Sequence, residues 1–202
     1  EETDGETLFY NNILSLEGSG IMGYVKIPCI SVNLPIYHGT SAEVLERGIG
    51  HLAASSFPIG GKSTHAVLTG HTGLSSAKLF TDLTEMKKGD LFFIHVLDKK
   101  LAYRVDQINV IRPEDTRKLQ IIDGKDYVTL LTCTPYGVND HRLLVRGIRT
   151  EYHEKEELTK RKTASFPVDG SLQEGDLDRF VDRIFLVGSR KMYRRIKGRR
   201  KK

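Results

Sequence analysis

The chain has 202 residues, 39% of them hydrophobic, which is enough for one domain with a substantial core. Its net charge of +5 comes from the C-terminus: the stretch from Arg190 to Lys202 holds nine Lys or Arg and no acid, and 22 basic residues face 26 acidic ones elsewhere. A nucleic-acid-binding domain carries its positive charge on a folded face, so this distribution argues against nucleic acid as a partner. No apolar stretch approaches the ~20 residues of a transmembrane helix, and we expect any membrane anchor to lie outside this sequence.

A β pattern follows a polar N-terminal segment that predicts one or two helical turns. Alternating apolar and polar residues, rich in β-branched and aromatic types, predict short strands. These predicted strands cover residues 21–30, 31–39, 64–71, 90–97, 100–111, 127–133 and 142–150. Short strands with few helices indicate an all-β barrel or sandwich.

Two short helices are predicted between these strands, over residues 40–48 and 75–86. In the first, Thr40 and Glu43 form a capping-box pair, and Gly48 is a natural stop.

The region after Thr150 differs from the β domain. Residues 151–162 predict a charged helix or linker, and the apolar spacing over 176–196 predicts an amphipathic helix that would dock on the β domain or lie at a membrane surface. We therefore expect an N-terminal segment at 1–19, a β domain at 20–150, and a C-terminal charged, helical and basic tail at 151–202.

Cys133 is the first candidate for chemistry. It follows the apolar run "TLLT" at the end of a predicted strand, where a loop begins, and such positions present reactive groups from a rigid scaffold. The alternative is a buried packing cysteine, which is common. For Cys29, inside a predicted strand, we prefer that alternative, and the sequence leaves open whether the two cysteines pair.

His71 ends an apolar run within "TGHTG", where glycines would allow close approach of a substrate. An imidazole near a thiol can activate it or protonate a leaving group. Arg142 begins the strand after the cysteine loop, and its guanidinium fork suits a developing oxyanion or a carbonyl. Taken alone, Arg142 is an ordinary surface arginine. Arg146 shares its strand parity, but proximity to the cysteine loop favours Arg142.

The remaining histidines do not indicate a metal centre. They lack the spacing of metal ligands, and we expect neither a metal nor a cofactor. His51 is expected to pack or hydrogen-bond near the cleft, and His141, next to Arg142, to line it.

The segments "TLLTCTPYGVNDHRLLVRG" (129–147) and "VLTGHTG" (67–73) together resemble the sortase family, and best its class C, the pilin-polymerising sortases of Gram-positive bacteria. The resemblance implies a closed eight-stranded β-barrel. It makes His71 the acid/base, Cys133 the nucleophile and Arg142 the oxyanion or substrate clamp. Thr132 matches the same box and is expected to add a polar contact to substrate.

The resemblance also implies an activity. A sortase attacks the Thr-Gly bond of an LPXTG-like sorting signal, forms a thioacyl enzyme and transfers the acyl group to an amine, in class C a pilin lysine. It works at the extracellular face of the cell membrane, in the cell envelope. Two alternatives stay open: a hydrolytic cysteine protease on the same residues, and a non-catalytic binding module with structural cysteines.

The sequence departs from class C at both ends. No Asp-Pro-aromatic motif, which class C sortases carry in an N-terminal lid over the thiol, occurs before Gly20, so we expect an uncovered thiol. The C-terminal region lacks a hydrophobic anchor.

Overall fold

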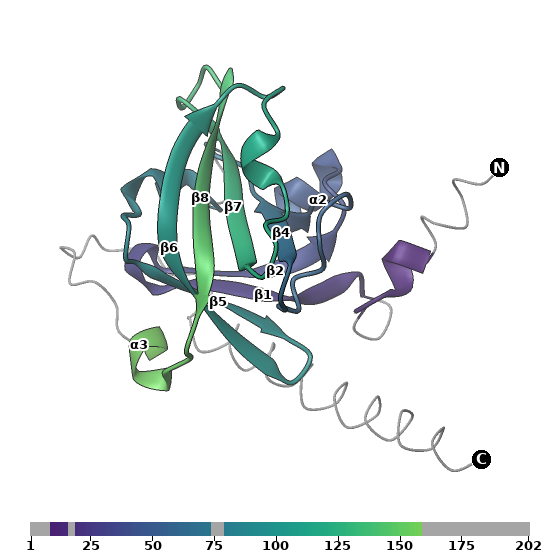
Figure 1. The fold of residues 1–202 in the computed structure, drawn as a ribbon. Helices are drawn as coiled ribbons and strands as arrows, with labels where there is room; N and C mark the ends of the chain where they lie inside the picture. Colours follow the sequence, from purple (N-terminus) through teal and green to yellow (C-terminus); the bar gives the residue numbers. More distant parts are fainter. Residues whose placement is uncertain (1–8, 16–18, 74–78, 159–202) are drawn as a thin grey trace, which may run out of the picture.

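The computed structural model describes residues 9–15, 19–73 and 79–158. Within them, eight strands close into a barrel in the order β1-β2-β3-β4-β7-β8-β6-β5 (Figure 1), which confirms the mostly-β, eight-stranded fold. The strands are β1 (Ile21–Ile27), β2 (Val32–His38), β3 (Ile49–His51), β4 (Thr64–Thr69), β5 (Leu91–Val96), β6 (Lys99–Ile111), β7 (Asp126–Thr134) and β8 (His141–Thr150). The helices are short: η1 (Pro28–Ile30), α2 (Ala42–Arg47), η2 (Thr81–Glu85), η3 (Arg117–Leu119) and α3 (Glu154–Leu158).

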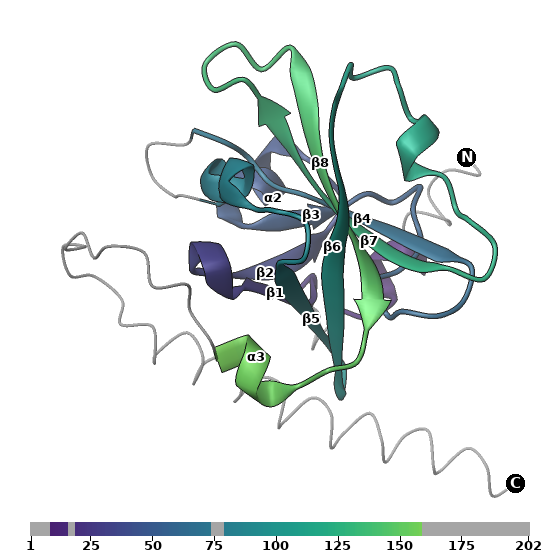
Figure 2. The same ribbon diagram turned by 60° about the vertical axis from the view of Figure 1, so that its left-hand side comes forward.

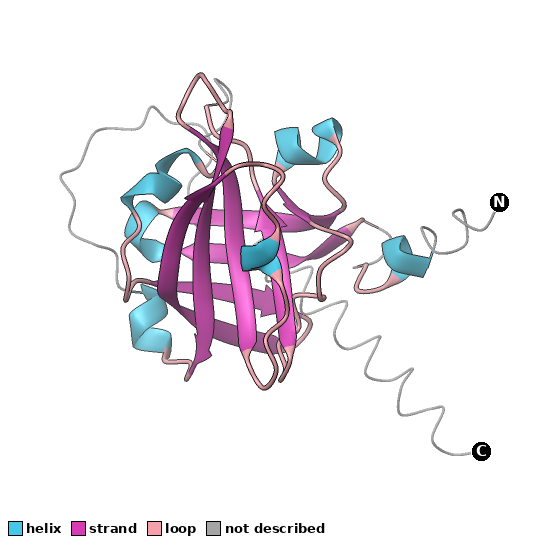
Figure 3. Cartoon of the chain, turned by 45° about the horizontal axis from the view of Figure 1, so that its top comes forward, coloured by secondary structure: helices cyan, strands magenta, loops and turns pink. Residues whose placement is uncertain are grey.

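Strand direction decides which ends meet. Most neighbours are antiparallel, but β2 pairs with β3 and β4 with β7 in parallel. The ends of β4 and β7 therefore lie at the same end of the barrel as the start of β8, where the β7–β8 loop projects at the top of Figure 2. The helices lie outside the barrel (Figure 3).

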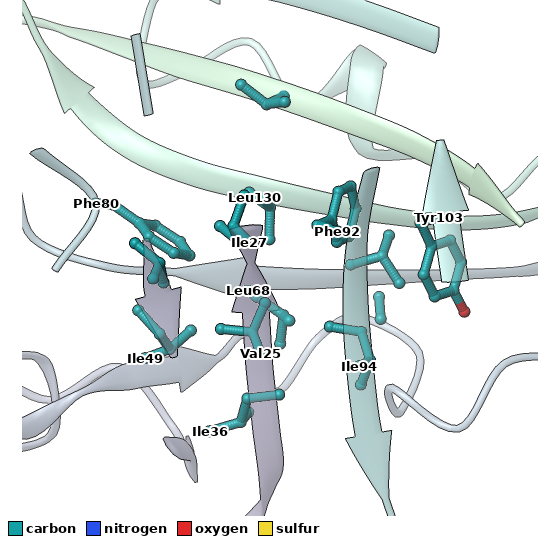
Figure 4. Packing of buried hydrophobic residues seen from close by; sticks show 14 of the residues in the cluster. Val25, Ile27, Ile36, Ile49, Leu68, Phe80, Phe92, Ile94, Tyr103 and Leu130 are labelled. Atoms are coloured by element: carbon teal, nitrogen blue, oxygen red, sulfur yellow. The ribbon is translucent and has the colours of Figure 1, made fainter. Parts of the chain in front are cut away.

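Alternation along each strand builds the core. Val128 and Leu130 of β7 point inward with Leu68 of β4, and they join one buried cluster inside the barrel (Figure 4). Phe92 stacks on Tyr103 at the other end of the cluster, with ring centroids 5.6 Å apart. Apolar burial of this extent is the main force that closes the barrel. The odd-numbered residues of β7 consequently face outward.

The structure differs from the sequence-based expectations in local details. The pattern did not predict β3. Ser41, not Thr40, caps α2, because its side chain accepts a hydrogen bond from the N–H of Val44. Cys29 lies in η1 rather than in a strand, since Pro28 ends β1 and starts a 3₁₀ turn.

The N-terminal residues 9–15 dock beside the barrel, at the right of Figure 1 and away from the β7–β8 loop. The Tyr10 hydroxyl lies 2.8 Å from Nδ1 of His51 and accepts a hydrogen bond from the N–H of Gly39. The other residues of the segment, 1–8 and 16–18, lie outside the described residues, so the uncovered thiol stays a prediction.

Beyond β8, α3 is held to the barrel by the buried carboxylate of Glu157, which lies 2.7 Å from Nε2 of His95. In the described residues, no helix has the length and apolar character needed to cross a membrane. The predicted amphipathic helix and basic tail, 176–202, lie outside the described residues. The division of the chain at 19/20 and 150/151 therefore remains our proposal.

Candidate active site

The β7–β8 hairpin places Cys133 directly opposite Arg142. The two residues are cross-strand partners in the ladder, one pair before the end of β7. Their neighbours Thr132 and Leu143 are buried, so alternation turns Cys133 and Arg142 to the outer face of the barrel. The sheet therefore fixes a thiol and a guanidinium side by side.

His71 reaches the same place from β4. The parallel register pairs Thr69 with Leu131, and the N–H of Gly70 continues it by donating to the carbonyl of Leu131 at 3.1 Å. His71 follows two residues after Thr69, at the same end of the barrel as Cys133 near the end of β7. Inward-pointing Leu68 gives His71 the same outward parity as Cys133. The three predicted residues thus converge at one end and on one face of the barrel.

Thr132 has a different position from the one expected. It is 1% exposed, and its hydroxyl donates to the carbonyl of Gly70 at 2.7 Å. That bond ties the end of β4 to β7, so Thr132 supports the loop of His71 from inside the barrel and does not face the outer site. His141 is at the surface, where Nδ1 contacts Asp140 at 2.8 Å, and this contact lowers the pKa of the Asp140 carboxyl.

The guanidinium of Arg142 is held by its own loop. Nη1 donates to the carbonyls of Asn139 and His141, at 2.9 and 3.0 Å. Among the described residues, the other guanidinium nitrogens have no acceptor. The loop therefore orients the fork while leaving donors for an incoming oxygen.

Arg146, the competing arginine, is already bound. It forms a two-point contact with Asp106, with nitrogen–oxygen distances of 3.1 and 2.6 Å, and it lies 4.2 Å from the ring centroid of Tyr127. Hydrogen bonding to Asp106 raises the pKa of Arg146. The geometry therefore separates two arginines that strand parity could not separate.

The glycines around His71 lie against apolar and aromatic side chains, and the Cβ of any other residue at Gly70 would also come within 2.7 Å of Cδ1 of Ile49. A Cβ on Gly70 would lie 2.8 Å from Cδ2 of Phe80, and one on Gly73 would lie 2.6 Å from Cε2 of Tyr136. Sequence reasoning missed both rings. The available signal was an aromatic residue three positions after Cys133, inside the motif itself.

The thiol is available for chemistry. No disulfide joins Cys133 to Cys29, and Cys133 is partly exposed. Within residues 9–15, 19–73 and 79–158, neither the thiol of Cys133 nor the ring of His71 has a hydrogen-bond partner. Over the same residues, no group of three or more His, Cys, Asp or Glu side chains could hold a metal ion.

Comparisons with known proteins agree with this geometry. The family model of the sortase domain matches residues 25–150. Sortase A of Bacillus anthracis is 28% identical over 135 residues, which is 66% of this chain and 61% of that protein. The chain spans about half to two thirds of the length of the first curated relatives it matches.

Solved structures give a stronger likeness. Sortase C1 of Streptococcus agalactiae superposes with a TM-score of 0.72 at 54% identity, over 74% of this chain and 77% of that one. Sortase C of Streptococcus pneumoniae gives 0.65 at 53% identity, over 66% and 68%. The chain therefore belongs to the sortase family, and these likenesses confirm its assignment to class C.

Proposed function

We propose that this protein is a cysteine transpeptidase. In this proposal it cleaves an LPXTG-like sorting signal between Thr and Gly through a thioacyl intermediate on Cys133, and joins the acyl group to an amine. The observation that supports the proposal is the Cys133–Arg142 cross-strand pair on the outer face, with His71 two residues beyond the end of the neighbouring strand β4.

The chemistry follows from these positions. The thiolate of Cys133 attacks the carbonyl carbon of the Thr, and Arg142 donates hydrogen bonds to the oxyanion that forms. His71 gives a proton to the departing glycine nitrogen, which leaves a thioester on Cys133. An incoming amine attacks the thioester, His71 takes up the amine proton, and Cys133 leaves as a thiolate; this completes the new amide bond and restores the starting thiolate and protonated His71.

The partners follow from class C. Pilin substrate specificity is described for sortase C of Streptococcus pneumoniae, to which this chain is similar. We infer pilin subunits as substrates, with an LPXTG-like signal as donor and a lysine side chain as acceptor. From such substrates we infer that the enzyme works at the extracellular face of the cell envelope.

Product analysis tests this function against the hydrolytic alternative. The protein is incubated with an LPXTG-type peptide, with and without an acceptor peptide that carries one lysine, and the products are identified by mass spectrometry. We expect an isopeptide-linked product, its absence when the acceptor lysine is changed to arginine, and no reaction by Cys133→Ala. Free Thr-terminated peptide alone, at every acceptor concentration, would show a protease instead.

The third possibility, a binding module, has a matched control. Cys29→Ala keeps the outer face unchanged, because Cys29 lies in η1 against the core. We expect Cys29→Ala to retain transfer.

A further inference from the structure

The site contains three residues but the sheet fixes only two of them. Cys133 and Arg142 are held by the β7–β8 ladder, whereas His71 lies two residues beyond the end of β4. Its loop must be held by other contacts, because a general acid or base works only at a fixed distance from the reacting atoms.

One side of the loop is anchored to the start of η2. The N–H of Phe80 donates to the carbonyl of His71 at 3.0 Å, and the N–H of Gly73 donates to Oγ1 of Thr81 at 3.1 Å. These bonds fix the loop toward η2. They do not connect it to the loop that follows Cys133.

Tyr136 supplies that connection. Gly73 has a φ of +78°, and the three atoms closest to a Cβ built on it all belong to the Tyr136 ring, at 2.6, 3.1 and 3.3 Å. The ring therefore lies directly against the backbone of Gly73. Any residue other than glycine at this position would place its Cβ in the space that the ring occupies. Tyr136 comes from the β7–β8 loop, so its ring bridges the loop of His71 and the loop of Cys133.

The loop backbone that carries Tyr136 is also hydrogen-bonded to Arg142. The carbonyl of Pro135 accepts hydrogen bonds from the N–H groups of Val138 and Asn139, and the carbonyl of Asn139 accepts from Arg142. A displacement of the loop would therefore reach Arg142 and Tyr136 together.

Exposure argues against a packing role in the core. Tyr136 is 71% exposed, so its ring contributes little apolar burial to folding. An aromatic residue left this exposed, with its covered part on the histidine loop, fits a local function better than a global one.

We propose that Tyr136 is a positioning residue that sets the place of His71 relative to Cys133 through ring contact with Gly73. The proposal rests on the assignment of His71 and Cys133 under the proposed function. It concerns the ring and not the hydroxyl, since the three closest atoms are ring carbons.

The first test measures the loop without any chemistry. Amide hydrogen exchange at Gly73 is followed by NMR in the parent, Tyr136→Ala, Tyr136→Phe and Val138→Ala; Val138 is a 66% exposed residue of the same loop. Tyr136→Ala should exchange at least about 10-fold faster at Gly73, while Tyr136→Phe and Val138→Ala match the parent. Parent-like exchange in Tyr136→Ala overturns the proposal, whatever the enzyme's activity.

The second test measures the coupling of the two side chains. Alkylation rates of Cys133 are recorded against pH for the same variants and for His71→Ala. The profile of Tyr136→Ala should move toward that of His71→Ala, and peptide cleavage should fall about 10-fold in kcat with KM unchanged. A profile that stays with the parent, or a loss confined to KM, rejects Tyr136 as a positioning residue.

These outcomes separate the two proposals. If the parent and His71→Ala give the same profile, the His71–Cys133 pair fails, and the catalytic role of Tyr136 fails with it. If they differ while Tyr136→Ala follows the parent, only the role of Tyr136 fails.

Discussion

The outer face of β4, β7 and β8 carries two clusters with similar side chains and opposite character. At the strand ends lie His71, Cys133 and Arg142. Four residues back along β7 and β8, Thr129 pairs with Arg146, and His65 of β4 lies beside them. Each cluster has one histidine, one arginine and one small nucleophile-type side chain.

In the cluster of His65, Thr129 and Arg146, called the inner cluster because it lies farther from the strand ends, every side chain has a partner within the protein. Nδ1 of His65 must donate to the carbonyl of Gln120 at 3.0 Å, so Nε2 accepts from the hydroxyl of Thr129 at 2.7 Å. Burial, as the largest cause, lowers the pKa of His65. Arg146 is neutralised by Asp106. Every member has a protein partner, which suits stability.

The cluster of His71, Cys133 and Arg142 at the strand ends, called the outer cluster, lacks side-chain partners of this kind among the described residues. Its arginine is bound only by loop carbonyls, and the part of the chain that the structure describes places no carboxylate on it. Residue type and strand face therefore do not make a site here. Position at the strand ends does, because there the ladder stops and side chains keep unused donors and acceptors for a substrate.

The largest expected effect comes from the nucleophile. Cys133→Ala should lower peptide cleavage below detection, with a melting temperature within about 3 °C of the parent, since a partly exposed strand-end side chain adds little packing. Thr129→Ala, its counterpart in the inner cluster, should keep turnover per folded molecule and lose stability. Cleavage by Cys133→Ala at even a tenth of the parent rate would show that Cys133 is not the nucleophile.

The two histidines should also differ, with His71 needed for turnover and His65 for stability. His71→Ala should lower kcat/KM by about 10²–10⁴ without unfolding, because it removes the proton carrier. His65→Ala should cost about 2–4 kcal/mol of unfolding free energy, because it leaves a cavity and unpaired polar groups at Thr129 and Gln120. Urea unfolding and initial rates measure both quantities. Equal rate losses per folded molecule would mean that the clusters act as one unit.

The two arginines give a smaller contrast. Arg142→Lys should lower kcat/KM by about 10²–10³, because lysine keeps the charge but loses the planar fork. Arg146→Lys should lose about 1–3 kcal/mol of unfolding free energy through the broken two-point contact with Asp106, with turnover near that of the parent. Near-parent turnover by Arg142→Lys would instead indicate simple charge steering.

The smallest effect on turnover is expected at Glu157, a buried carboxylate that, like Arg146, is bound by other side chains of the protein. Burial alone would raise its pKa, but contacts with His95, Tyr152 and Lys26 outweigh burial and lower the pKa to about 2 from 4.5. Because the folded-state pKa lies below the unfolded one, this stabilisation is present above pH 4.5 and is lost as the pH falls toward 2.

Glu157→Gln should therefore lower the unfolding free energy near pH 7 by about 1–3 kcal/mol and flatten its decline in acid. Glu154→Gln, on the exposed side of α3, is the matched control and should follow the parent. Unfolding free energies from a urea series at each pH give the comparison. If the unfolding free energy of Glu157→Gln falls with decreasing pH as steeply as that of the parent, the Glu157 carboxylate does not cause the acid dependence.

Much of the fold was readable from alternation, because one face of each long strand packs in the core. β3 was not, since three residues cannot establish a period. It depends instead on contacts from elsewhere: a Cβ on its central Gly50 would lie 2.4 Å from the carbonyl oxygen of Gly39. The cap at Ser41 was missed because two neighbouring residues were both good caps.

The candidate site was readable from strand ends and from the family motif. The sequence could not show which side chains pack against the glycines near His71. Gly70 and Gly73 mark close approach, but only the tertiary structure reveals that Ile49 and Phe80 lie against the first and Tyr136 against the second. Likewise, Arg142 and Arg146 have the same parity, and the discriminating partner, Asp106, sits 40 residues away in the chain.

If the strand-end cluster works as one acyl-transfer site, an acyl enzyme forms on Cys133 and can be trapped. The protein is mixed with an LPXTG-type peptide without acceptor, quenched in acid, and mapped by peptide mass spectrometry. We predict the mass of the Thr-terminated acyl group on Cys133 in the parent, less of it in His71→Ala and Arg142→Lys, and a parent-like amount in a folded Arg146→Lys. An adduct on Cys29, or undiminished acylation of Cys133 in both His71→Ala and Arg142→Lys, would contradict the account.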